Sequence, residues 1–113
     1  MEFYKKVDEM LITLKETKEY KAYIKLKKEI KADKTKSQIL AEFKNKQKQI
    51  QLDYIKNNGA IDVAEKEKME KLYAIIVKNK EINEFLQLEI EIDLMLGNMQ
   101  KMVAEAIVEI NEF

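Results

Sequence analysis

The chain has 113 residues, 46% hydrophobic and 37% charged, a composition that excludes disorder and suits one domain spanning residues 1–113. Cysteine and histidine are absent, which excludes disulfides, most zinc sites and the usual pairs of nucleophile and general base. The 21 basic residues, all lysine, balance 21 acidic residues, and without arginine the bidentate fork favoured for phosphate is missing. We therefore expect a protein that is not an enzyme, with no catalytic residues, no cofactor and no metal.

The N-terminal stretch MEFYKKVDEM has charges where a signal peptide needs an uninterrupted apolar segment. No run in the chain approaches the roughly 18 apolar residues of a membrane-spanning helix. The sequence therefore predicts a cytoplasmic protein that does not associate with membranes.

Helices are expected throughout, because the chain has no proline and only two glycines to break them. The first helix is predicted from an apolar stripe with helical spacing. That stripe comprises Phe3, Val7, Met10, Leu11 and Leu14. Thr17 can cap a second helix, which is expected to continue to Ala32 and Asp33.

The third and fourth helices are predicted from their start and stop signals. Asp33 is placed to cap a helix from about Lys34 to Asn58, where the sequence Asn-Asn-Gly at 57–59 would end it. Asp62 can cap the next helix, which should end near Lys78 and Asn79. The third helix would be roughly 37 Å long, well beyond the ~13 Å radius of gyration of a compact domain of this size. We therefore predict an elongated or paired molecule.

The stretch LQLEIEIDLML, from Leu86 to Leu96, has an apolar residue at every second position, which is typical of a half-buried strand. A lone strand would leave its backbone groups unpaired, and no other segment alternates over more than a few residues. At 100° per residue, the apolar residues from Phe85 to Ile110 instead form one broad face within about 140° of arc. That face comprises Phe85, Leu88, Ile92, Met95, Leu96, Met99, Met102, Val103, Ala106, Ile107 and Ile110. The sequence thus predicts an all-α fold, an elongated bundle of about five helices with a long C-terminal one.

A second apolar stripe on the C-terminal helix is formed by Leu86, Ile90, Leu94 and Gly97. A surface helix of a monomer needs only one such face, so the second must also be covered. The first helix could cover it within the chain, or a second copy could do so between chains. We predict a homodimer with these four residues at the self-association or partner interface, since Gly97 lets a neighbouring backbone approach. The alternative is a monomer whose five helices close over both stripes.

Charge is unevenly distributed along the chain. Residues 15–36 hold nine lysines against four acidic residues, whereas residues 81–113 hold eight acidic residues against one lysine. Lys21, Lys25 and Lys28 on the basic segment are candidate contacts for RNA or an acidic partner. Their neighbouring Tyr and Ile have helical core spacing and no RNA-binding motif accompanies them, which argues against direct nucleic-acid binding. An RNA-associated accessory factor is kept as the alternative to a protein-binding role.

Two segments carry a family resemblance. EYKAYIKLKKEIKADKTKSQILAEFKNKQKQIQ, from Glu19 to Gln51, resembles the part of the YlbF/YmcA family in which a Tyr-containing helix ends at an Asp and the next helix carries a Leu and Phe pair, here Leu40 and Phe43. KLYAIIVKNKEINEFLQLE, from Lys71 to Glu89, is similar to the family's helix that ends at Asn before an aromatic-Leu pair, here Phe85 and Leu86.

The resemblance, which is nearest to the small YheA-like branch, implies an all-helical, dimer-forming cytoplasmic regulatory protein of bacteria. Some members control competence, sporulation and biofilm formation by assisting ribonuclease Y, so the resemblance also implies a protein partner in an RNA-processing complex. The best-studied members contribute cysteines to Fe–S clusters. This chain has none, so it departs from the family there.

Overall fold

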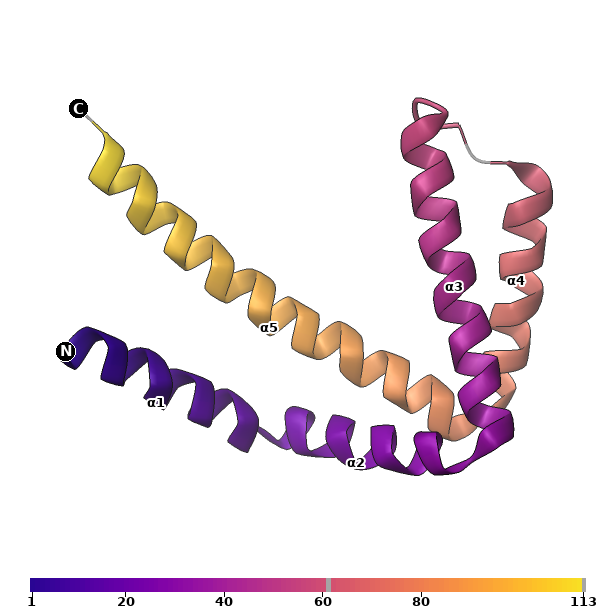
Figure 1. Cartoon of the computed structure of the whole chain (residues 1–113), viewed down its shortest axis with the longest axis horizontal. Coiled ribbons are helices and arrows are strands. Elements are labelled where there is room, and N and C mark those ends of the chain that lie inside the picture. The colour runs from indigo at the N-terminus through magenta and orange to yellow at the C-terminus, as the bar shows by residue number, and fades with distance from the viewer. Residues whose placement is uncertain (61, 113) are drawn as a thin grey trace. The chain divides into compact units, whose positions relative to one another are not determined.

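The computed structural model describes residues 1–60 and 62–112, and Figure 1 shows its helices in chain order. The five helices are α1 (Glu2–Glu16), α2 (Lys18–Ala32), α3 (Lys34–Lys56), α4 (Val63–Lys78) and α5 (Lys80–Asn111). Within the described ranges no residue lies in a strand, and the alternating stretch around Ile90 is helical. The prediction of an all-α fold with a long C-terminal helix is confirmed.

Three polar side chains cap helices at the predicted positions. Thr17 Oγ1 accepts a hydrogen bond from the Tyr20 amide at 3.2 Å, at the start of α2. Asp33 accepts from the Lys36 amide at 3.1 Å at the start of α3, and Asp62 accepts from the Ala64 amide at 2.9 Å at the start of α4. Each cap satisfies an amide that has no partner within its own helix, which fixes where the helix begins.

Helix α3 ends at Lys56, two residues before the predicted Asn58. Asn58 has a φ of 52° and the Gly59 amide donates to the Tyr54 carbonyl at 2.8 Å, which is the bonding pattern of a Schellman motif. Gly59 has a φ of 91°, a conformation that residues with a Cβ rarely adopt. The Asn-Asn-Gly sequence therefore does end the helix as expected, but the helix stops before it and all three of its residues form the turn.

The chain divides into two compact units, Met1–Lys25 with Leu86–Phe113, and Leu26–Phe85. In the second unit α3 and α4 pack side by side as a helical hairpin (Figure 1). Four helices contribute buried apolar side chains to this unit: Ile30, Phe43, Ile76, Ile82 and Phe85. Phe85 belongs to the broad apolar face predicted for the C-terminal helix, whereas Ile82 lies outside it. The expectation that the whole chain forms one domain stays a prediction.

The first unit is built from α1, the start of α2 and most of α5, and it buries much less. Helix α1 has no buried residue, and Ile92 of α5 is the one described apolar residue of this unit that is buried. Phe3 and Tyr4 remain 62% and 66% exposed although their rings contact each other with centroids 5.4 Å apart. Most of the apolar surface of this unit is therefore open to solvent.

Candidate interaction surfaces

The predicted α5 stripe of Leu86, Ile90, Leu94 and Gly97 is open along most of its length. Leu86 is half-buried, whereas Ile90 and Leu94 are 54% and 63% exposed. Helix α1 does not cover them, because the groove of about 390 Å³ between α1 and α5 is lined from α5 by residues of the broad face and by Asn98. The structure thus leaves the stripe without cover from α1.

Helix α2 lies beside one edge of the stripe. The pKa of Tyr23 is raised, first because burial disfavours the charged phenolate and then because the carboxylates of Glu89 and Asp93 lie near it. These two acidic residues flank the stripe on the side facing α2. The opposite edge, with Gln87, Glu91 and Asn98, is solvent exposed.

Gly97 lies in the interior of α5, where glycine is less favourable than alanine by roughly 1 kcal/mol. Apart from the adjoining backbone of α5 itself and its two chain neighbours, a Cβ built at this position would meet no atom of the described chain within 4 Å. Packing within the chain therefore gives no reason for a glycine here. A close approach by another molecule would give one.

Lys21, Lys25 and Lys28 are all solvent exposed on α2. Their spacing of four and three residues places them on one face of the helix. The structure therefore brings these three predicted contacts together, and their role in binding RNA or an acidic partner stays a prediction.

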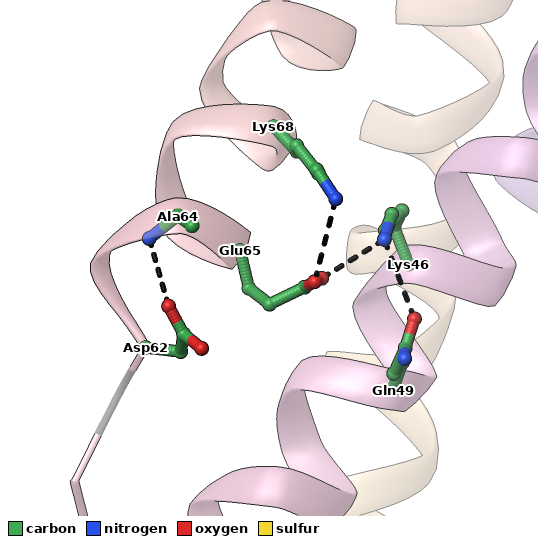
Figure 2. Close-up of polar contacts among 6 residues, drawn as sticks. All are labelled: Lys46, Gln49, Asp62, Ala64, Glu65 and Lys68. Atoms are coloured by element: carbon green, nitrogen blue, oxygen red, sulfur yellow. Dashed lines mark hydrogen bonds and ion pairs between the residues drawn. The ribbon is translucent and has the colours of Figure 1, made fainter.

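The α3–α4 hairpin carries an ion-pair cluster that sequence reasoning did not find. Lys46 Nζ on α3 donates to Glu65 Oε2 on α4 at 2.9 Å and lies 3.4 Å from Gln49 Oε1, while Lys68 Nζ lies 3.7 Å from Glu65 Oε1 (Figure 2). The Glu65 side chain is only 18% exposed, so it is partly shielded by the two lysines. The cluster ties the two helices of the hairpin together beside a groove.

That groove, which we call the lysine-rimmed groove, runs between α3 and α4 and has a volume of about 460 Å³. It is lined by Glu42, Asn45, Lys46, Gln49, Lys68, Lys71, Leu72 and Ile75. A second groove of about 340 Å³ on the same hairpin is lined mainly by apolar residues, including Phe43, Met69 and Tyr73. Two packed helices cover only the apolar residues that lie between them. The apolar residues on either side of the contact between α3 and α4 therefore line open grooves.

The Glu65 cluster makes stability depend on pH. The hydrogen bond from Lys46 holds the pKa of Glu65 below its ordinary value of 4.5. Because the folded pKa is the lower one, this stabilisation is present above the ordinary carboxyl pKa and is lost as the pH falls through the lowered value. We expect Glu65→Gln to reduce the drop in urea midpoint between pH 7 and pH 3. Glu67→Gln, on the exposed side of α4, is the matched control and should leave the drop unchanged; an equal effect of both would contradict the role of the pair.

Across residues 1–60 and 62–112, no group of three acidic side chains is arranged to hold a metal ion. None of the helices in the described part of the chain has the length and apolar character needed to cross a membrane. The chain is thus a small all-helical protein, and its helices leave apolar faces and grooves open to solvent. These surfaces are its candidate binding sites.

The chain belongs to the YlbF/YmcA family. The family described as control of competence regulator ComK, YlbF/YmcA, matches residues 3–108. The description names regulation and no chemical reaction, and the match confirms the family predicted from the two helical segments.

Related proteins resemble the chain over most of its length. A UPF0342 protein of Desulfitobacterium hafniense is 28% identical over 112 residues, covering 97% of this chain and 88% of the relative. A UPF0342 protein of Symbiobacterium thermophilum is 27% identical over 94 residues, or 83% of each chain. One from Caldicellulosiruptor bescii is 27% identical over 99 residues, covering 88% of this chain and 82% of the relative.

Proposed function

We propose that the protein is a non-enzymatic regulatory adaptor that forms a homodimer through the α5 stripe and acts by binding other proteins in the cytoplasm. The observation that carries the proposal is the exposure of Ile90 and Leu94 on a helix whose other apolar face is already turned toward α1. Burying such a side chain is worth roughly 1.5–3 kcal/mol. A second copy that covers the stripe would therefore gain several kcal/mol of stability.

Symmetry favours a second copy as the molecule that covers the stripe. The same stripe on two copies can pair about a two-fold axis, which is the commonest arrangement of homo-oligomers. Gly97 would let the two α5 backbones approach closely. Family membership extends the proposal to control of competence, and the resemblance of the two helical segments extends it to accessory work for ribonuclease Y.

The test is the oligomeric state of Ile90→Glu, measured by sedimentation and light scattering over a range of protein concentrations. A buried glutamate without a partner is strongly unfavourable, so we expect the dissociation constant to rise at least about 30-fold. Ile55→Glu is the matched control, because Ile55 is 73% exposed on α3 and lies outside the stripe. A wild-type chain that stays monomeric, or a dimer that Ile90→Glu leaves intact, would refute the proposal.

Gly97→Ala separates the interface from the stability of the helix. Alanine should stabilise an isolated α5 by about 1 kcal/mol, yet its methyl group should weaken a dimer in which two backbones meet at Gly97. Increased helix stability together with weaker association is the expected result. Association equal to that of the wild type would place Gly97 outside the interface, and stronger association would mean that the two backbones do not meet there.

A further inference from the structure

The lysine-rimmed groove combines an apolar floor with a basic edge. Leu72 and Ile75 supply apolar surface, and Ile75 is 50% exposed. Lys68 and Lys71 lie along the α4 edge, and the Lys68 side chain is 60% exposed. Glu42 is the one acidic residue among those that line the groove. Such a surface suits an amphipathic helix with an acidic edge.

The chain itself carries a segment with these properties, which we call the α5 tail, residues 102–111. After Lys101 the described chain has no basic residue, and Glu105 and Glu109 lie one helical turn apart. The tail is apolar on most of its remaining surface, and all of it is exposed. The exposed fractions are 71% for Met102, 54% for Val103, 51% for Ile107, 65% for Val108 and 79% for Ile110.

The α5 tail cannot reach the groove of its own chain while α5 stays helical. Glu105 lies 25 residues beyond Lys80, about 37 Å along the helix. The α4 residues that line the groove, Lys68 to Ile75, lie within about 20 Å of Lys80 at the same rise per residue. These lengths keep the two apart at any angle between α4 and α5. An α5 tail in the groove must therefore come from a second molecule.

We propose that the α5 tail of one copy docks in the lysine-rimmed groove of a second copy, with Glu105 and Glu109 facing Lys68 and Lys71. The inference rests on the proposed dimer, and it adds how the two α5 helices of that dimer are aligned. If two α5 helices pair antiparallel about the middle of the stripe, residue 103 of one copy lies beside Lys80 of the other. Residues 104–111 then extend about 12 Å beyond the start of the second copy's α5. Two-fold symmetry makes the contact reciprocal.

Complementary charge reversals in the full chain test this contact. The groove variant is Lys68→Glu with Lys71→Glu, and the tail variant is Glu105→Lys with Glu109→Lys. Each variant alone places like charges together, and we expect its dimer to dissociate about tenfold more readily at low salt. An equimolar mixture should restore wild-type association, because groove and tail are then complementary at both contacts of a heterodimer. Sedimentation and capture of one tagged variant by the other measure both results.

Three comparisons keep the outcome interpretable. Lys48→Glu with Lys56→Glu changes the hairpin by the same charge at exposed positions outside the groove, and should not restore the association of the tail variant. Helicity by circular dichroism shows that each variant folds. A mixture that associates no better than its components overturns the groove contact. If Ile90→Glu still dissociates the dimer in that case, the dimer through the α5 stripe stands and only the contact between tail and groove is refuted. A wild-type chain that is monomeric refutes both the dimer and the contact.

Discussion

Replacement of Phe43 by alanine is expected to lower the free energy of unfolding by about 3–5 kcal/mol. Phe43 is 6% exposed on α3, in the unit where four helices contribute the buried residues. Removing its ring loses the transfer free energy of a large apolar group and leaves a cavity that the hairpin can fill only in part. A loss of this size is a large fraction of the stability of a small domain.

Urea denaturation followed by circular dichroism measures this loss, at one fixed protein concentration because association adds to apparent stability. Phe3→Ala is the matched control. Phe3 is 62% exposed on α1, so its replacement should change the free energy of unfolding by no more than about 0.5 kcal/mol. Comparable losses for the two variants would mean that the buried position assigned to Phe43 is wrong.

Two adjacent isoleucines on α4 provide the second large effect. Ile76 is 0% exposed and Ile75 is 50% exposed, so Ile76→Ala should cost about 2–5 kcal/mol and Ile75→Ala less than about 1 kcal/mol. Both substitutions remove the same atoms and change helix propensity equally. The difference between their urea midpoints therefore reports which face of α4 is turned into the core. The reverse order would mean that the helix is rotated from the position described.

Local signals in the sequence were sufficient to locate most helix ends. A hydroxyl or carboxylate side chain just before a helical pattern can accept a hydrogen bond from an unpaired amide of the first turn, so Thr17, Asp33 and Asp62 each mark a boundary. The long helical run after Lys80 was also predictable, because a lone strand has no partner for its hydrogen bonds. These interactions act within a few residues, which is why one sequence reveals them.

Features that depend on distant residues were not predicted. Lys36 Nζ lies 3.0 Å from Glu81 Oε2, and Lys46 pairs with Glu65, but a chain with 21 lysines and 21 acidic residues offers too many equivalent pairs to select these. Ile82 is fully buried although it stands outside the predicted stripes. One local feature was also missed: Asn79, predicted only as the end of α4, accepts a hydrogen bond from the Ile82 amide at 3.1 Å and so caps α5.

The candidate interface was predicted from periodicity, which identifies residues that share a face of a helix. It could name Leu86, Ile90 and Leu94 as one stripe, but it could not say which face of α5 the first helix would take. The structure supplies that choice, because the groove between α1 and α5 is lined by the broad face. The lysine-rimmed groove required the pairing of α3 with α4, and no pattern within either helix indicates it.

Helix α5 belongs to both compact units, since its first turns contain Ile82 and Phe85 and the rest carries the stripe. A cut at the boundary after Phe85 would expose unsatisfied backbone carbonyls on one fragment and amides on the other. Neither fragment would keep an intact helix end. We therefore expect the hairpin and the stripe to keep their structures together only where α5 is kept whole.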